Sequence, residues 1–338
     1  WNEPCVPVYT TGTSIDTGGQ PRESLRTVYG RIDQDIDRAI ELLEKARETT
    51  LAENNKSHIN LYVALGIKSR ACLAEGDWDG AFKAAKRVID EGGYAVGTKS
   101  DLTGGMNSLG KQNVMWGAGI QVADQAGGYA GFFTHMDNKE GAYAKSAPKL
   151  ISKQLYNRIS ATDIRRDWWD PSDKESPYVS KKFSFANVAS FLGDYIYMRV
   201  EEMYFTAAEA ALRLDDLKNA RELMNTVMAE RDPGYSANNR SGTLLGATTT
   251  TWTGSFLENI LTHRRIELWG EYGRLFDVRR LGQGIDRRTD DGFSEECISM
   301  MNRRNVNITK ADTYDWVLTI PKAELDANPN INEEDQNP

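Results

Sequence analysis

Hydrophobic residues first recur at helical spacing between residues 23 and 47. Leucine, valine and isoleucine occupy every third or fourth position there, at Leu25, Val28, Ile32, Ile36, Ile40 and Leu43. Acidic residues such as Asp33 and Asp37 stand between them. A stripe of this kind is typical of an amphipathic helix that covers a hydrophobic core. The pattern therefore predicts a long helix over residues 23–47.

Helical hairpins are predicted over residues 58–92 and 202–230. In the first, one helix stops at Gly76 and the next begins with Asp77 as its N-cap. When Asp77 is aligned with Asp216, Leu65 aligns with Tyr204, Ser69 with Ala208, Ala71 with Ala210, Ala81 with Ala220 and Val88 with Val227, so the small residues of the two segments coincide. Small residues allow antiparallel helices to approach closely. The chain thus contains two copies of a hairpin that resembles a tetratricopeptide repeat.

Between the hairpins, residues 94–195 lose this periodicity and gather glycines and large rings. The aromatic and histidine residues of this insertion include Trp116, Tyr129, Phe132, Phe133, His135, Tyr143, Trp168, Trp169 and Tyr178. Long loops inside a compact protein are usually functional or disordered, and so many hydrophobic rings argue against disorder. We therefore expect the insertion to contain the ligand-binding region.

The most ordered charge pattern lies in residues 262–282. One apolar line at helical spacing consists of Leu261, Leu268, Tyr272 and Leu275. A second line alternates cations and anions and consists of Arg264, Glu267, Glu271 and Arg274. Such a helix can be packed between neighbouring elements, because each carboxylate can pair with a guanidinium group when it is buried. We expect one helix here, with Glu267 and Glu271 mostly buried and each paired with an arginine or a backbone donor.

These residues carry a resemblance to a known family. The run Arg264-Arg265-Ile266-Glu267-Leu268, followed by Glu271, Arg274, Phe276-Asp277 and Arg279-Arg280, is similar to the C-terminal signature helix of the SusD/RagB family of nutrient-binding outer-membrane lipoproteins. The stretch from Trp316 to Asn330, with Gln336-Asn337-Pro338 after it, resembles the ending of the same family. The resemblance implies an all-α fold of tetratricopeptide-like helical hairpins with long irregular insertions.

On this basis we expect a single SusD-like domain over residues 1–338. Its parts are the N-terminal helices and first hairpin (23–93), the aromatic-rich insertion (94–195), the second hairpin with the signature helix (196–282), and an irregular C-terminal segment (283–338). Family members usually carry a signal peptide, a lipidated cysteine and further repeat helices ahead of the segment that starts here. The resemblance therefore implies that an N-terminal portion is missing.

Composition excludes some classes of function. Against 41 Lys and Arg stand 49 Asp and Glu, and the net charge of −8 disfavours nucleic acid, because phosphate binding needs a basic field. No apolar run approaches the roughly 20 residues that span a bilayer. Cys5, Cys72 and Cys297 are an odd number without a CxxC pair, so neither a zinc site nor a disulfide framework is expected. Cys72 is expected to be a small core residue.

No motif for catalysis, for a cofactor or for a metal stands out. His58, His135 and His263 lie far apart in the sequence, which disfavours a histidine metal cluster. A glycosidase needs two carboxylates beside one bond, but carboxylates are too abundant here to be diagnostic. We therefore expect a protein that is not an enzyme, with no catalytic residue, no metal and no cofactor.

Carbohydrate recognition requires what the insertion contains. A sugar ring packs its C–H groups on an aromatic ring, while polar side chains bind its hydroxyls. The candidate carbohydrate-binding residues are Trp116, Tyr129, Phe132, Phe133, His135, Asn138, Trp168, Trp169 and Tyr178, with Asp137 and Lys139 as further polar contacts. At least two of the large rings should be exposed and line one groove. Of the adjacent Trp168 and Trp169, one should be buried and the other exposed. The competing interpretation is that each ring only fills space between loops.

The resemblance also implies a partner and a location. A SusD-like protein captures oligosaccharide at the cell surface and passes it to a SusC-like TonB-dependent transporter of the outer membrane. It reaches the membrane only through an N-terminal lipid anchor, which this chain does not contain. The alternative within the family is a peptide or another nutrient. Outside the family, the alternatives are a tetratricopeptide scaffold that binds protein and a hydrolase.

Overall fold

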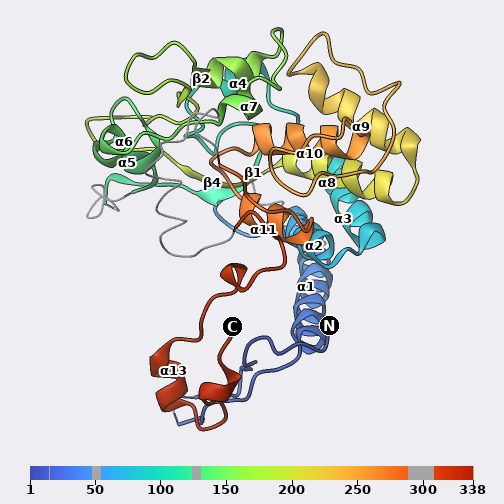
Figure 1. The fold of residues 1–338 in the computed structure, drawn as a ribbon, viewed down its shortest axis with the longest axis vertical. Coiled ribbons are helices and arrows are strands. Elements are labelled where there is room, and N and C mark those ends of the chain that lie inside the picture. The colour runs from blue at the N-terminus through green and yellow to red at the C-terminus, as the bar shows by residue number, and fades with distance from the viewer. Residues whose placement is uncertain (15, 48–54, 124–130, 288–307, 338) are drawn as a thin grey trace.

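A computed structural model gives the fold and describes residues 1–14, 16–47, 55–123, 131–287 and 308–337. Helices dominate these residues, which also form two small two-stranded antiparallel sheets (Figure 1). The elements in chain order are α1 (Leu25–Arg47), α2 (Leu61–Glu75), α3 (Trp78–Glu91), α4 (Lys99–Leu102), β1 (Val114–Ala118), α5 (Phe132–Met136), α6 (Ala142–Ser146), α7 (Lys153–Tyr156), the 3-10 helix η2 (Ile164–Trp168), β2 (Trp169–Asp170), β3 (Val179–Ser180), β4 (Tyr195–Arg199), α8 (Val200–Arg213), α9 (Leu217–Ala229), α10 (Phe256–Glu267), α11 (Arg274–Arg280), η4 (Tyr314–Trp316), α13 (Lys322–Ala327) and η5 (Glu333–Asp335). The predicted all-α fold of helical hairpins with long insertions is confirmed.

Both predicted hairpins are present, one as α2 with α3 and the other as α8 with α9. Helix α2 ends at Gly76, which has a φ of +81° in the left-handed region that favours glycine. Asp77 caps α3 by accepting a hydrogen bond from the N–H of Gly80 at 3.0 Å. Asp216 caps α9 in the same way, by accepting a hydrogen bond from the N–H of Asn219 at 3.1 Å. The correspondence of the two aspartates in the sequence therefore reflects the same local structure.

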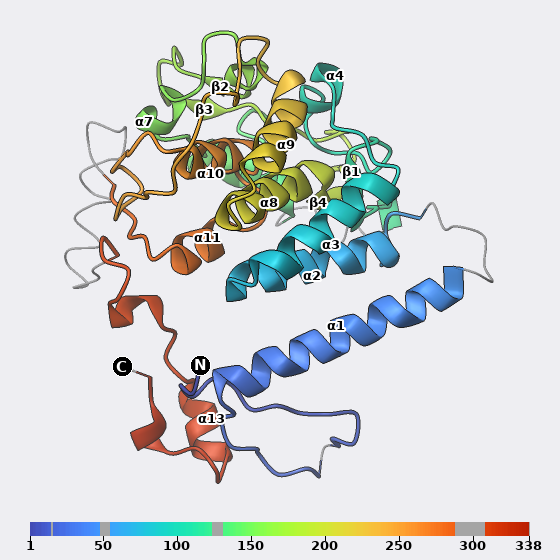
Figure 2. The ribbon, with the colours of Figure 1, turned by 90° about the vertical axis from the view of Figure 1, so that its right-hand side faces the viewer.

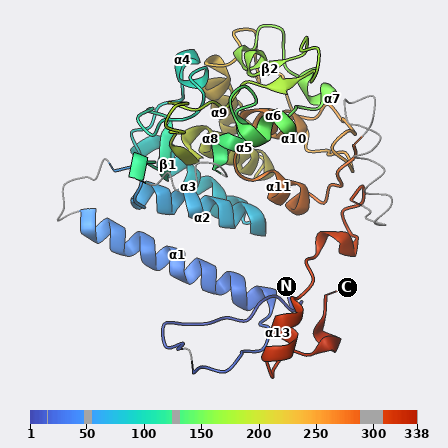
Figure 3. The same ribbon diagram turned by 90° about the vertical axis from the view of Figure 1, so that its left-hand side faces the viewer.

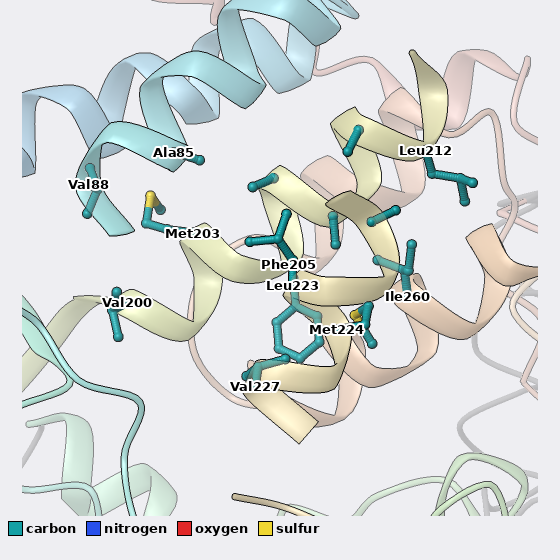
Figure 4. Packing of buried hydrophobic residues seen from close by; sticks show 14 of the residues in the cluster. Ala85, Val88, Val200, Met203, Phe205, Leu212, Leu223, Met224, Val227 and Ile260 are labelled. Atoms are coloured by element: carbon teal, nitrogen blue, oxygen red, sulfur yellow. The ribbon is translucent and has the colours of Figure 1, made fainter. Parts of the chain in front are cut away.

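The two hairpins share one hydrophobic core, in which small residues bring the helices together. Helix α3 packs against both α2 and α8, and α8 also packs against α9 and α10. Figure 4 shows buried side chains from these helices, among them Ala85, Val88, Met203, Phe205, Met224 and Ile260. Alanines allow the backbones to approach, and the larger side chains fill the space that remains. This core is the scaffold on which the insertion is held.

Cys72 belongs to a small cluster between the hairpins. It is buried with Leu73, Ala81 and Ala210. Burial, with a smaller effect from the nearby Asp77, raises the pKa of the thiol to about 12. The predicted role of Cys72 as a core residue is confirmed.

Helix α1 lies on the outer side of α2, as Figures 2 and 3 show, and leads to the two ends of the chain. The segment before α1 and the segment that contains α13 lie side by side. Arg22 Nη1 donates a hydrogen bond to the carbonyl oxygen of Asp335 at 2.8 Å, and Asn328 Nδ2 donates one to that of Gln20 at 2.9 Å. Hydrogen bonds therefore join the segment before α1 to the C-terminal segment that contains α13.

The prediction of one helix over residues 262–282 is wrong. Helix α10 ends at Glu267 and helix α11 begins at Arg274, with a turn between them. Gly270 and Gly273 in this turn have φ values of +74° and +106°. Residues with a side chain rarely adopt such values, so the two glycines end the helix and redirect the chain.

The turn also breaks the predicted apolar line. Leu261 and Leu268 are buried, but Tyr272 is 38% exposed and Leu275 is 57% exposed. The residues after Gly270 therefore face a different part of the protein from those before it. They reach the surface near α2 and the sheet formed by β1 and β4.

The insertion contains a second hydrophobic core, made mostly of aromatic residues. Its buried members include Phe133, Tyr156, Trp168, Trp169, Phe183 and Phe185. Ile266 of helix α10 is fully buried among them, so this core rests directly on the signature region. The antiparallel pair of β1 and β4 joins the insertion to the start of α8.

Candidate functional site

A cavity of about 470 Å³ lies between α2, the β1–β4 sheet and the turn after α10. Its volume falls in the range of about 300–1,000 Å³ that is usual for small-molecule sites. We call it the aromatic cavity, because six of its lining residues carry aromatic rings and only two are charged. The lining residues are Arg70, Met106, Trp116, Phe132, Phe183, Tyr195, Ile196, Tyr197, Gly270, Glu271 and Tyr272.

One wall of the aromatic cavity comes from the β1–β4 sheet. The ring of Trp116 meets the ring of Tyr197 edge to face, with the centroids 5.1 Å apart. The pairing is irregular on both sides of Trp116. At Gly117, an added Cβ would lie 2.2 Å from the carbonyl oxygen of Tyr195, so only glycine permits this approach of the strands. Tyr197 is 41% exposed and stands at the rim of the cavity.

The inner wall is a cluster of rings around Phe132. The ring centroid of Phe132 lies 5.3 Å from that of Phe183 and 5.9 Å from that of Tyr195. The backbone N–H of Phe132 donates a hydrogen bond to the hydroxyl of Tyr195 at 3.3 Å. This contact fixes the start of helix α5 against strand β4.

Arg70 of helix α2 borders the cavity and ties three elements together. Its Nε and Nη2 donate to the two carboxylate oxygens of Glu202 at 2.9 and 2.7 Å. Nη2 also donates to the carbonyl oxygen of Tyr197 at 2.8 Å. The guanidinium lies 3.8 Å from the ring centroid of Tyr272, which is a cation–π contact. Arg70 therefore holds the two exposed tyrosines in place.

Glu271 is the acidic residue of the lining, and buried cations neutralise it. It accepts a hydrogen bond from Lys182 Nζ at 2.5 Å and two from Arg199 at 2.8 Å each. Burial alone would raise the pKa of Glu271, but Arg199 and Lys182 hold it below its usual value. Burial also lowers the pKa of the Lys182 ammonium group to about 8, although Glu271 opposes this shift. The turn that carries Glu271 is thus fixed to strand β4.

Glu267 lies deeper and is fully buried. Arg231 donates to it at 2.9 and 3.0 Å, Arg199 at 2.9 Å and Arg165 at 3.2 Å. Burial would raise the pKa of Glu267, but these guanidinium groups hold it well below its usual value. The predicted buried pairing of Glu267 and Glu271 is confirmed.

The cations that pair with these carboxylates come from other parts of the chain. The spacing in the sequence suggested pairing within one helix, but Arg264 instead binds Asp277, with Nε 3.0 Å from Oδ2. Arg165 lies in η2, Arg199 in β4 and Arg231 after α9. The network therefore joins the insertion and the second hairpin to the signature region.

The structure brings two of the predicted binding residues, Trp116 and Phe132, together in the aromatic cavity. His135 is exposed elsewhere and stacks on Tyr143, with the centroids 4.5 Å apart. Tyr178 packs on Tyr156. Tyr129 lies outside the described residues. The cavity thus gathers only part of the predicted set.

The predicted polar contacts support the loop instead. Asn138 donates to the carbonyl oxygen of Ser180 at 2.7 Å, and its side-chain oxygen accepts from the N–H of Lys149 at 2.9 Å. Asp137 is buried, and it accepts from the N–H groups of Lys139 and Glu140 in a local turn and from that of Phe185. These bonds shape the backbone around α5 and α6.

The prediction that one of Trp168 and Trp169 is buried and the other exposed is wrong. Their exposed fractions are 2% and 1%. The indole N–H of Trp168 donates to the carbonyl oxygen of Leu102 at 2.9 Å. Trp169 meets the ring of Trp269 edge to face at 5.7 Å. Both tryptophans, like Phe133, fill the second core, as the competing interpretation had it.

Sequence reasoning missed most of the lining. Tyr195, Ile196 and Tyr197 form a short aromatic and β-branched run before the second hairpin, which is a strand signal that was available. Tyr272 was assigned to a helix line that the glycine turn interrupts. Arg70 carries no signal in the sequence, because it lies in a regular helix of the first hairpin.

Comparisons with known proteins agree with this fold. The sequence model of the SusD family matches residues 135–338, more than half of the chain. A SusD-like carbohydrate binding protein from Bacteroides vulgatus has a similar structure, with a TM-score of 0.77 and 25% identity over 99% of this chain and 71% of that one. A SusD superfamily protein from Bacteroides thetaiotaomicron has a TM-score of 0.76 and 23% identity, over 99% of this chain and 71% of that one. Surface glycan-binding protein A from Bacteroides uniformis has a TM-score of 0.65 and 18% identity, over 98% of this chain and 72% of that one. No curated protein matches.

Among the described residues, no helix is both long enough and apolar enough to cross a bilayer. The same residues contain no group of three or more histidine, cysteine or acidic side chains placed to hold a metal ion.

Proposed function

Because the chain belongs to the SusD family, we propose that it binds an oligosaccharide and that the aromatic cavity is the binding site. The observation that carries this proposal is the joint presence of Trp116, Tyr197 and Tyr272 at one opening. The rings of Trp116 and Tyr197 offer apolar surface to the C–H groups of a sugar, and the tyrosine hydroxyls and the indole N–H offer hydrogen bonds. The ring of Tyr272 is covered by Arg70 and by the stacked ring of Phe276, so Tyr272 contributes its hydroxyl and its edge.

Support also comes from the names of similar proteins. One structural neighbour is described as a carbohydrate binding protein and another as a surface glycan-binding protein. Neither name identifies a ligand for this chain. They favour a sugar over the alternatives of a peptide, another nutrient or a protein partner bound to the hairpins.

We further propose that this protein acts at the cell surface, held to the outer membrane by a lipid anchor. There it would deliver the oligosaccharide to a SusC-like TonB-dependent transporter. The role is one of binding without catalysis. In keeping with this, the charged residues of the lining pair with other side chains, Arg70 with Glu202 and Glu271 with Lys182 and Arg199.

A glycan array followed by calorimetric titration tests the proposed function. The protein should bind a defined group of oligosaccharides, and the selected glycan should compete with other glycans of that group for one site. A peptide array measured in parallel tests the main alternative. Binding to peptides without binding to any glycan would contradict the proposal.

A further inference from the structure

The aromatic cavity lacks the side chains that usually bind sugar hydroxyls. Among its described lining residues there is no asparagine, glutamine, aspartate, serine or threonine. Its only carboxylate, that of Glu271, already accepts three hydrogen bonds from buried cations. Nε and Nη2 of Arg70 are engaged with Glu202 and the backbone. Few partners therefore remain for hydroxyls that enter the cavity.

The lining is also graded from its inner end to its opening. Met106 and Phe183, at 7% and 3% exposure, form an inner end. The polar groups of the described lining beside it already make hydrogen bonds: the hydroxyl of Tyr195 accepts one from the N–H of Phe132, and Glu271 accepts three from buried cations. Tyr197 and Tyr272, at 41% and 38%, form a rim that carries hydroxyl groups. A ligand that fits this gradient has an apolar group at one end and hydroxyls at the other.

A fully hydroxylated sugar unit does not have this form. Each of its hydroxyls that moved to the inner end would lose its water and find few partners among the described lining residues, which weakens binding. A methyl group in the same place would gain from burial against Met106, Ile196 and Phe183. The remaining hydroxyls of such a sugar would stay at the rim, beside the tyrosines and water.

We propose that the aromatic cavity selects a sugar unit that carries a methyl group, as a 6-deoxyhexose or an N-acetylhexosamine does. This inference rests on the proposed function and specifies its ligand class. The methyl group is the shared chemistry of the two sugars, and it occupies the inner end of the cavity. The rim tyrosines pack against the rest of the ring.

Two matched pairs of ligands test the inference and distinguish the two sources of the methyl group. The first pair is L-fucose and L-galactose, which have the same configuration and differ only by a hydroxyl at carbon 6. The second pair is chitotriose and cellotriose, which differ by the acetamido groups. Titration of the protein should show about tenfold or tighter binding for the methyl-bearing member of at least one pair. Equal affinities within both pairs, or a preference for the hydroxylated members, would overturn the inference.

Variants of the lining test where in the cavity the methyl group of the sugar binds. Ile196→Thr replaces the ethyl branch of a lining side chain with a hydroxyl, so the ratio of the two affinities within a ligand pair should fall severalfold. Ile59→Thr is the matched control, because Ile59 is 48% exposed and is not a lining residue. Phe132→Tyr adds a hydroxyl at a second position of the lining, and it tests the same prediction if Ile196→Thr does not fold. An unchanged preference in the folded variants would overturn the placement of the methyl group.

The outcomes separate this inference from the proposed function. If the protein binds glycans on an array but neither member of either pair, the methyl preference is wrong and oligosaccharide binding stands. If it binds no glycan at all, both fail. If only apolar peptides bind, the cavity is a side-chain pocket, and both fail in favour of the peptide alternative.

Discussion

Glu271 accepts two hydrogen bonds from the guanidinium of Arg199, from Nε and from Nη2, each at 2.8 Å. Glu271 lines the aromatic cavity, and Arg199 ends the strand that supplies two of the cavity's tyrosines. This pair therefore joins two walls of the cavity from beneath. The binding surface depends on a largely buried ionic network, of which Glu271 reaches the cavity.

Replacing Glu271 with alanine should destabilise the protein strongly. Lys182 and Arg199 would remain buried without their shared carboxylate, which costs about 3 kcal/mol or more. Urea unfolding measures the loss. Glu222→Ala is the control, because its side chain is 61% exposed and lies 3.9 Å from Lys218, so its removal should have little effect. A Glu271 variant as stable as the control would refute the role of the network.

His263 should make the protein sensitive to mild acid. Its ring is buried and accepts a hydrogen bond from Arg165 at Nδ1, at 2.8 Å. Burial, followed by the charge of Arg165, lowers its pKa well below the usual 6.5. The unfolded chain takes up a proton below pH 6.5 that the folded protein does not, so stability falls as the pH falls.

The measurement is the free energy of unfolding between about pH 7 and about pH 5. His263→Gln should flatten the decline in this range, whatever it does to stability at neutral pH. His58→Gln, at an exposed position, should leave the decline unchanged. A decline as steep in His263→Gln as in the wild-type protein would contradict the neutral, buried state of His263.

Gly270 should not tolerate a side chain. Its φ is +74°, and an added Cβ would lie 2.6 Å from the ring of Phe183, which lines the cavity. Gly270→Ala should therefore lower stability by more than the roughly 1–3 kcal/mol of backbone strain alone, and it should weaken glycan binding. Gly282→Ala is the matched control, because Gly282 also has a positive φ, of +62°, but faces open space. Equal decreases in the melting temperature of the two variants would contradict the predicted clash.

Trp168→Ala should destabilise the protein by about 3–5 kcal/mol, because it removes a ring that is 2% exposed and leaves a cavity in the second core. Denaturant unfolding measures this loss. The ring is not part of the aromatic cavity, so the variant that remains folded should bind glycan nearly as well as the wild type. Selective loss of binding at unchanged stability would place the ligand at Trp168 instead.

Local patterns in the sequence predicted the parts of the fold that depend on neighbouring residues. The stop at Gly76 and the cap at Asp77 both act within a few residues, and both are as expected. The glycines that divide the signature region were equally visible. Their effect was missed because the helical spacing of charged and apolar residues continues across Gly270 and Gly273.

The candidate site depended on contacts that no local pattern records. Trp116 and Phe132 were predicted, but no local pattern favoured them over Trp168 or Trp169. What distinguishes them is exposure, and exposure follows from how the insertion folds on helix α10. Arg70 lies more than a hundred residues before its partner Glu202, so its place at the cavity could be seen only in three dimensions.

Binding of glycan in the aromatic cavity is tested by comparing two tryptophan variants. Trp116→Ala and the matched Trp252→Ala are titrated by calorimetry with the glycan that the array selects. Trp116 lines the cavity, whereas Trp252 stacks on Arg158 outside it. Stacking on an aromatic ring predicts at least about tenfold weaker binding for a Trp116→Ala protein that remains folded, and wild-type affinity for Trp252→Ala. Wild-type affinity in a folded Trp116→Ala protein would contradict the account and place the ligand elsewhere.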